Sequence, residues 1–276
     1  FADLSWAVQP VEPVQGIKET PRSQDPLFEL GILGGAVLTP DYLGSDQSRF
    51  RFLFFPNFRY RGKIFRSEEN EGTRARLIRD PIFVLDFSFG FNFPVDSQDN
   101  EARQGMDDID FVVEFGPRLK IRLREETENW TKLELAFPLR GVLQSDLQYY
   151  QDRGLTFSPG IQIGRKNMFC ARCQLFVRLS ALFATERHND LFYQVDPQFA
   201  TPDRPYFDAQ EGYLGFSVFS GYVLRIGQVQ AFIGYNHYTY DGATNLASSL
   251  IRTRTNDIFI FGFGWLFWRS SERGYK

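Results

Sequence analysis

The chain has 276 residues, a net charge of −3 and two histidines. That charge argues against general nucleic-acid binding, and the mean hydropathy of −0.31 with no run of 18 apolar residues excludes a membrane-spanning helix. The 30 phenylalanines, 12 tyrosines, 4 tryptophans and 23 glycines are typical of one aromatic-rich β architecture.

The N-terminal part of the chain passes from an unpatterned segment into alternating strands. Residues 1–26 contain prolines and scattered charge without sustained alternation, which predicts a periplasmic arm. Apolar and polar side chains begin to alternate at Leu27, and a second alternating run covers 49–61 after a loop rich in Pro, Gly and Asp. The polar segment 63–80 predicts two short strands around a loop.

The stretch from Pro81 to Pro94 decides how the other strands are interpreted. Its large apolar side chains fall on one parity: Phe83, Leu85, Phe87, Phe89, Phe91 and Phe93. The other parity carries Val84, Asp86, Ser88, Gly90 and Asn92. A repeat of two residues indicates a strand. A large apolar face opposite a polar one is typical of a transmembrane barrel, with lipid outside and a polar lumen inside.

Further alternating runs follow in the rest of the chain. They cover 109–123, 132–143, 155–163, 175–183, 214–224, 229–240 and 259–267. Ile109 and Leu214 begin two of these runs on the parity that we expect to face lipid. Two long segments between the runs, 95–107 and 188–208, predict loops.

These runs predict an all-β fold, a closed antiparallel transmembrane β-barrel of about 12 strands, or of about 10 if the segment 63–80 does not pair. The turns on one side are shorter than the loops on the other, as in barrels whose long loops lie outside the cell. Both termini would then be periplasmic. The domain organisation that we expect is an arm at 1–26, the barrel at 27–268 and a C-terminal extension at 269–276.

Charged side chains cluster on the parity that faces the lumen. They are Arg49, Arg51, Arg59, Asp86, Asp110, Glu114, Arg118, Lys120, Arg122, Lys132, Glu134 and Arg140. One interpretation is an ion-pair network that fills a narrow barrel, because an unpaired charge away from bulk water is costly. The other is a conduit for small anions. We favour the filled lumen, because wide aqueous pores usually have about sixteen strands.

The two cysteines, Cys170 and Cys173, lie in a turn between two strands. This spacing could indicate redox chemistry or half of a zinc site, but no second Cys or His pair accompanies it. We therefore favour a small disulfide formed in an oxidising compartment.

Several short segments carry a family resemblance. They are PDYLGSD at 40–46, GMDDID at 105–110, FPLRG at 137–141, FSP at 157–159, FYQV at 192–195 and YFDAQEGY at 206–213. Together and in this order they resemble the MipA/OmpV family of outer-membrane proteins, over about 27–268. The chain departs from the family at 241–251, with Ser248-Ser249-Leu250 where a Ser-Pro is usual.

The resemblance implies an envelope barrel without catalytic residues. Members of the family are described as scaffolds between a murein-cleaving lytic transglycosylase and a murein synthase, and others as adhesins or stress-linked surface proteins. It therefore implies protein partners rather than a substrate.

Candidate chemistry is sparse. His237 and Thr239 would share one face near the outer end of a strand, as a base and a hydroxyl do for acyl transfer. The sequence offers no orienting acid at a convincing spacing, and no phosphate loop, metal cluster or cofactor motif is found. We expect no catalytic, metal-binding or cofactor-binding residues, and lipid hydrolysis stays a minor alternative.

The sequence thus predicts a non-enzymatic protein of the outer membrane of a Gram-negative bacterium, acting as an envelope scaffold or surface-interaction protein. Its expected partners are outer-membrane lipid and lipopolysaccharide, together with periplasmic murein enzymes or other envelope proteins, and not nucleic acid. The alternative is a small-solute channel. Binding of murein enzymes would support the first hypothesis, and single-channel conductance the second.

Overall fold

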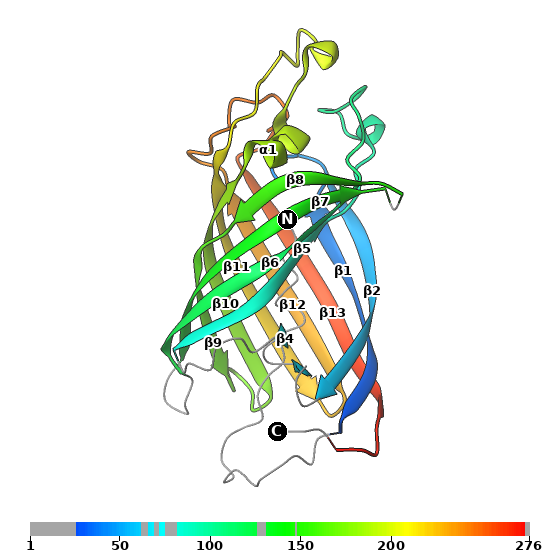
Figure 1. The fold of residues 1–276 in the computed structure, drawn as a ribbon, viewed down its shortest axis with the longest axis vertical. Coiled ribbons are helices and arrows are strands. Elements are labelled where there is room, and N and C mark those ends of the chain that lie inside the picture. Colours follow the sequence, from blue (N-terminus) through cyan, green and yellow to red (C-terminus); the bar gives the residue numbers. More distant parts are fainter. Residues whose placement is uncertain are drawn as a thin grey trace.

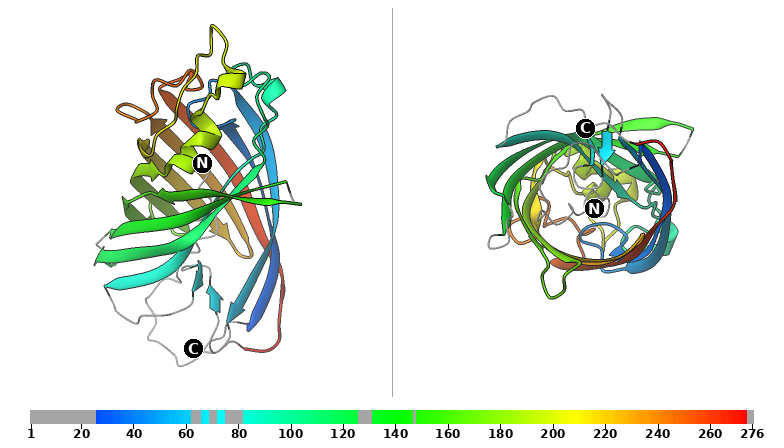
Figure 2. Two further views of the ribbon diagram at one scale, coloured as in Figure 1. Left: turned by 45° about the horizontal axis from the view of Figure 1, so that its top comes forward. Right: turned by 90° about the horizontal axis from the view of Figure 1, so that it is seen from below.

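The computed structural model of the chain is one antiparallel sheet that curls around a central axis (Figures 1 and 2). It describes residues 26–61, 66–68, 72–74, 82–125, 131–146 and 148–273. The strands are β1 (Phe28–Pro40), β2 (Ser48–Arg61), β3 (Arg66–Glu68), β4 (Gly72–Arg74), β5 (Phe83–Asn92), β6 (Phe111–Arg124), β7 (Lys132–Ser145), β8 (Tyr150–Phe157), β9 (Gly160–Lys166), β10 (Cys173–Ala184), β11 (Gly212–Ile226), β12 (Val229–Thr239) and β13 (Thr255–Arg269). The helices are α1 (Glu186–Tyr193) and the short 3-10 turns η2 (Ser97–Asp99) and η3 (Pro197–Phe199).

The strands follow one another around the sheet almost in chain order. The path runs β4-β3-β2-β1-β13-β12-β11-β10-β8-β7-β6-β5. β8 and β9 both pair with β7 and β10, so they are two halves of one strand that Ser158 and Pro159 interrupt. Pro159 has no N–H to give to a ladder. The prediction of an all-β antiparallel barrel fold of about 12 strands is confirmed.

The two ends of this path approach each other on the side of β2 and β5. The Arg51 guanidinium lies 4.8 Å from the centre of the Phe93 ring and donates to the Pro94 carbonyl at 3.2 Å. The rings of Phe55 and Phe91 are 6.4 Å apart. These side-chain contacts join β2 to the end of β5, and the sheet looks like a ring when viewed from below (Figure 2).

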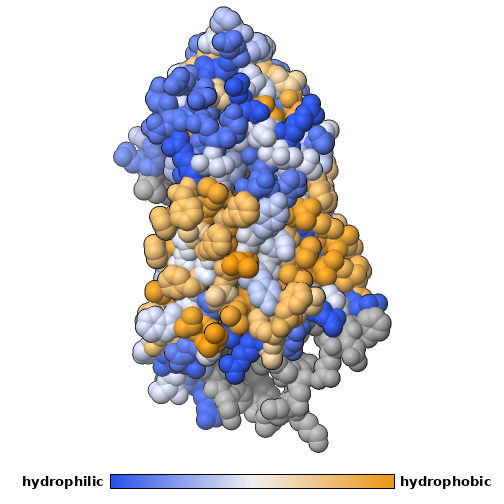
Figure 3. Space-filling model, turned by 180° about the vertical axis from the view of Figure 1, so that it is seen from behind, coloured by the Kyte–Doolittle hydropathy of each residue, from blue (hydrophilic) through white to orange (hydrophobic). Residues whose placement is uncertain are grey.

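The outer surface of the sheet is apolar at the predicted positions. On β2, Phe50, Phe52 and Phe54 are exposed, Phe52 by 68%. Figure 3 shows hydrophobic residues gathered in a band across the middle of the molecule, with hydrophilic residues above and below. Such a band is too large for a monomer in water and is typical of a barrel in lipid. In the part of the chain that the structure describes, no helix has the length and hydropathy to cross a bilayer.

The inner surface has two different sides. Charged residues line β5, β6 and β7, whereas β1, β11 and β13 bury apolar side chains such as Val37, Phe219 and Ile258. The Phe219 ring covers Gly221, where an added Cβ would lie 2.8 Å from the ring. This side of the lumen is therefore more apolar than predicted, although Thr39, Ser217 and Asn256 on the same strands are buried polar residues. Here apolar side chains occupy both parities of the strand.

Two positions predicted to face lipid are buried elsewhere. Ile109 is 1% exposed and Leu214 4% exposed, and both pack beneath the loops at one end of the barrel. The predicted loop 188–208 also contains most of α1 and all of η3. The alternation of apolar and polar residues continues beyond the lipid-facing part of the strands. It therefore does not show where a strand leaves the membrane and the loops begin.

Candidate functional site

A buried ion-pair network lies on the inner face of β5 and β6. The Asp86 carboxylate accepts hydrogen bonds from Arg118 Nε at 2.8 Å and Arg118 Nη2 at 2.9 Å. Lys120 Nζ lies 2.8 Å from the second carboxylate oxygen. Asp86 and Arg118 are cross-strand partners, so the register itself brings the charges together. Both cations share this one carboxylate.

The network extends across β7 through further pairs. Arg140 donates to Ser88 Oγ at 2.9 Å and lies 3.4 Å from Glu114, which also accepts from Thr156 at 2.9 Å. Towards the other end of these strands, Glu134 lies 3.1 Å from Lys132 and 3.4 Å from Arg122. Asp110 accepts from Gln144 at 2.9 Å. Charges from three neighbouring strands thus meet on one wall.

Two of the predicted lumen residues, Arg49 and Arg51, belong to a different cluster. Both bind the buried carboxylate of Asp41, at 2.9 and 3.2 Å, and Asn100 donates to its other oxygen at 2.9 Å. This cluster ties the loop after β1 to the loop after β5. The side chain of Arg59 lies outside the described residues.

The long loops build a second hydrophobic core at one end of the barrel, which we call the loop cap. Its buried members are Tyr42, Val95, Met106, Ile109, Val112, Val142, Ala184, Leu191, Phe192, Tyr193, Val195, Ala209, Leu214 and Leu250. Hydrogen bonds lock the segments together: Tyr42 donates to the Leu250 carbonyl at 2.8 Å, and Ser248 to the Tyr193 carbonyl at 2.7 Å. Figure 1 shows α1 at this end of the barrel.

The loop cap explains most of the short segments that carry the family resemblance. Tyr42 comes from PDYLGSD, Met106 and Ile109 from GMDDID, and Phe192 and Tyr193 from FYQV. These segments are far apart in the sequence and meet only here. Sequence reasoning treated them as separate loops, because no local pattern reports contacts between loops.

Arg103 is a buried cation within the loop cap, 3% exposed. It donates to Ser97 Oγ at 3.2 Å, to the Asp107 carbonyl at 3.1 Å and to the Leu191 carbonyl at 3.5 Å. Its guanidinium also lies 5.8 Å from the centre of the Tyr42 ring. One side chain therefore joins the loop after β5 to α1.

We expect Arg103→Met to loosen the loop cap while the barrel stays folded. The substitution keeps an apolar stem but leaves buried acceptors unpaired, at a cost of about 1–3 kcal/mol. Hydrogen exchange should become faster in 95–109 and in α1. The matched control is Arg187→Met, because Arg187 only forms an exposed pair with Asp152 at 2.6 Å. Equal exchange in both variants would contradict this role of Arg103.

His188 gives the loop cap a pH dependence. Burial lowers the pKa of its imidazole, whereas in the unfolded chain the value is about 6.5. The folded state therefore favours the neutral ring. This stability is fully present above the unfolded pKa and is lost as the pH falls from there towards the lowered folded value. The protection of the α1 amides, taken as the intrinsic exchange rate at each pH divided by the observed rate, should be lower at about pH 5.5 than at about pH 7.5.

The control for this pH effect is His188→Gln, which should flatten the difference between the two pH values. Asp190 acts in the opposite sense at lower pH: burial, and then the charges of Glu186 and Asp208, raise the pKa of its carboxyl. A pH response that persists in His188→Gln would assign the effect to another group.

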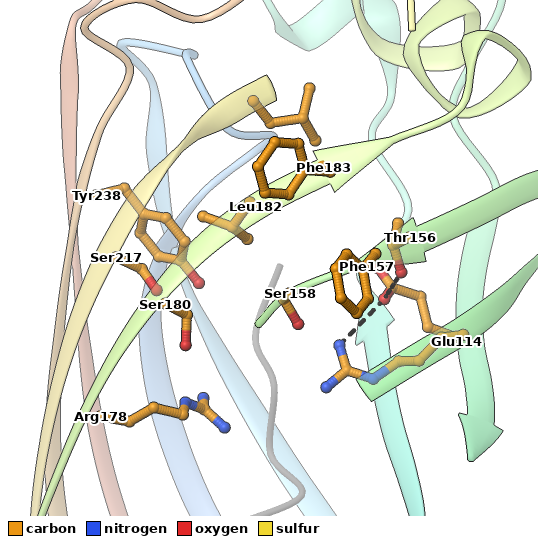
Figure 4. A pocket seen from close by; sticks show the side chains of 12 residues that line it. Glu114, Thr156, Phe157, Ser158, Arg178, Ser180, Leu182, Phe183, Ser217 and Tyr238 are labelled. Carbon is orange, nitrogen blue, oxygen red and sulfur yellow. Dashed lines mark hydrogen bonds and ion pairs between the residues drawn. The ribbon is translucent and has the colours of Figure 1, made fainter. Parts of the chain in front are cut away.

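A small cavity lies inside the barrel between the charged wall and the loop cap. Its volume is about 30 Å³, enough for roughly two water molecules. Figure 4 shows Glu114 and Thr156 on one side and Arg178, Ser180, Ser217 and Tyr238 on the other. The second Glu114 oxygen, Oε1, accepts no hydrogen bond from the described residues. The cavity suits ordered water rather than a larger ligand.

His237 has the acidic neighbour that sequence reasoning did not find. Its Nδ1 lies 2.8 Å from Asp257 Oδ1, and Tyr235 donates to the same oxygen at 2.7 Å. Asp257 comes from β13, so only the cross-strand register reveals the pair. Among the described residues, Thr239 makes no hydrogen bond to His237. The pair therefore lacks the bound hydroxyl that acyl transfer needs.

The two cysteines form a disulfide in the turn between β9 and β10. Cys173 is the first residue of β10, and Cys170 lies within the turn. Within the turn, the Cys173 N–H donates to the Cys170 carbonyl at 3.2 Å.

Comparison with known proteins gives one strong match and several distant ones. A family model described as "MltA-interacting protein MipA" matches residues 32–267, and no curated protein sequence matches. The β domain of the Bordetella autotransporter BrkA is 10% identical and covers 87% of this chain and 100% of its own, with a TM-score of 0.43. The outer membrane protease OmpT from Escherichia coli is 11% identical, with 91% and 99% covered and a TM-score of 0.30. The Ralstonia pickettii toluene transporter TbuX is 10% identical, with 95% and 100% covered and a TM-score of 0.31. Likeness at this level carries no functional argument.

Proposed function

The chain belongs to the MltA-interacting protein MipA family, and on that premise we propose that it is a non-enzymatic scaffold of the outer membrane. In this proposal the barrel holds a periplasmic murein enzyme, such as a lytic transglycosylase, at the membrane, and its loops form a compact outer surface. The observation that carries the proposal is the filled interior. The loop cap packs at one end, and most charged side chains of the wall form ion pairs with one another. A filled interior favours a function carried out by the surfaces of the barrel rather than by its lumen.

The proposed orientation places both termini in the periplasm, with residues 1–26 as an arm and 269–276 as an extension of the barrel 27–268. Support comes from contacts between the start of β1 and the segment after β13, at the end of the barrel opposite α1. The Leu27 N–H donates to the Glu272 carbonyl at 2.7 Å, and the Ser270 N–H to the Phe28 carbonyl at 2.8 Å. An epitope added after Lys276 that is labelled on intact cells would contradict this orientation.

The direct test is binding between purified proteins. The barrel is placed in lipid nanodiscs and titrated with a purified lytic transglycosylase of the same organism, with an unrelated outer-membrane barrel as control. We expect saturable binding by the barrel and none by the control. Absence of binding up to about 100 μM would reject the scaffold proposal, because specific interfaces are usually tighter.

The charged wall favours one alternative, a small-solute channel. We expect the intact protein to show little steady conductance in planar bilayers, because the loop cap and the network around Asp86 and Arg140 occupy the interior. Deletion of 186–208, which removes α1, should raise the current. Heat-modifiable gel mobility controls for folding of the variant. Large, stable, anion-selective steps from the unaltered protein would favour the channel instead.

A further inference from the structure

The turn between β9 and β10 displays an aromatic side chain at the end of the barrel opposite the loop cap. Phe169 is 83% exposed, the greatest exposure among the large hydrophobic residues that the structure describes. Because β10 runs from this turn towards α1, the turn lies at the end of the barrel where β1 begins and β13 ends. In the proposed orientation it faces the periplasm.

The backbone of this turn is held in an unusual conformation. Asn167 and Phe169 have φ values of 54° and 69°, the left-handed region that residues other than glycine rarely adopt. The Asn167 N–H donates to the Cys173 carbonyl at 2.7 Å, and Tyr222 donates to the Met168 carbonyl at 2.9 Å. The disulfide between Cys170 and Cys173 closes the turn. Asn tolerates this conformation, but a turn built only to connect two strands would use glycine or a polar residue where this chain has Phe169.

The chemistry around Phe169 matches a protein interface rather than a simple connection. Arg165, Lys166 and Arg172 flank it, and no Asp or Glu occurs between positions 165 and 173. Phe, Met and Arg are enriched in protein interfaces. The Arg172 carbonyl accepts the Arg225 N–H at 3.1 Å, which fixes the far side of the turn to β11. The result is a preorganised apolar tip within a positive rim.

We propose that this turn is the docking element for the periplasmic partner. Phe169 would enter an apolar pocket of that partner, and the basic side chains would face an acidic rim around the pocket. The inference rests on the proposed scaffold function, because it names the surface through which the murein enzyme is held. A fixed turn loses little conformational entropy on binding, so the disulfide contributes affinity without touching the partner.

The test repeats the nanodisc titration with variants of the turn. Phe169→Ser should weaken binding about tenfold or more, as the loss of a central aromatic anchor does. The matched control is Tyr149→Ser, because Tyr149 is 76% exposed at the opposite end of the barrel. This substitution should leave the affinity for the partner unchanged. The Cys170→Ser/Cys173→Ser double variant keeps every contacting side chain and should also bind more weakly. Heat-modifiable mobility of each variant confirms that it is folded.

The outcomes separate the two proposals. If the unaltered barrel binds and Phe169→Ser binds equally well, the docking site is wrong and the scaffold function stands. If the unaltered barrel does not bind, both proposals fail. A third measurement addresses membrane contact: Phe169→Trp is compared with the unaltered chain, which has 4 tryptophans, in nanodiscs with brominated lipid. Extra quenching in the variant would place the side chain in the bilayer and overturn the docking site.

Discussion

Asp86→Ala should destabilise the barrel by about 3–5 kcal/mol, because it removes one member of a buried charge network and leaves the others uncompensated. Arg118 and Lys120 both lie 2.8 Å from this carboxylate, and all three side chains are buried. Chemical unfolding in lipid vesicles, followed by heat-modifiable gel mobility, measures the loss. The exposed Asp99 pairs with Arg49 at 3.4 Å, so Asp99→Ala should change stability by less than about 0.5 kcal/mol.

A second variant tests whether the loss of stability in Asp86→Ala arises from unpaired charge. Replacing Asp86, Arg118 and Lys120 together by leucine or methionine removes both the pairing and the need for it. Exchange of a buried ion pair for packed apolar groups is often neutral or stabilising. We therefore expect the triple variant to be more stable than Asp86→Ala alone. A triple variant that is less stable than the single one would show that the network contributes net attraction.

Much of the barrel wall could be predicted from the sequence, because lipid imposes a strict alternation on every strand. Phe83 to Phe91 on β5 and Phe259 to Phe267 on β13 point outward as expected, and their partners point inward. Phe93, which follows β5, packs against the inner cluster around Val37 instead. The period of two fixes the face of each residue without knowledge of its neighbours. Strand number followed from counting these runs.

The loop cap could not be predicted in the same way. Its contacts, such as Tyr193 Oη donating to the Leu43 carbonyl at 3.1 Å, join residues that are far apart in the chain. The pairing of His237 with Asp257 likewise depends on the register between β12 and β13. The apolar side of the lumen could not be predicted either, for a related reason. Ile258 and Ile260 lie on the inward parity, but parity alone does not say whether that face meets water or a packed core.

The wall and the cap therefore have different physical origins, and damage to one should spare the other. Strand pairing and lipid contact specify the wall, whereas loop packing and buried hydrogen bonds specify the cap. Arg103→Met should act on the cap and Asp86→Ala on the wall. A residue on the outer face of the wall is a third case, since its environment is the bilayer itself.

Phe89→Arg should cost about 2–4 kcal/mol of stability in lipid, the range measured for Arg near the bilayer midplane of such barrels. Phe89 lies near the middle of β5, on the outer face, with its ring 4.9 Å from that of Phe115. The substitution removes this contact and places a cation in hydrocarbon. Unfolding titrations in vesicles measure the cost. Tyr149→Arg, in an exposed loop, is the matched aromatic control and should be nearly neutral. Equal stability of the two variants would mean that the apolar band around Phe89 does not face lipid.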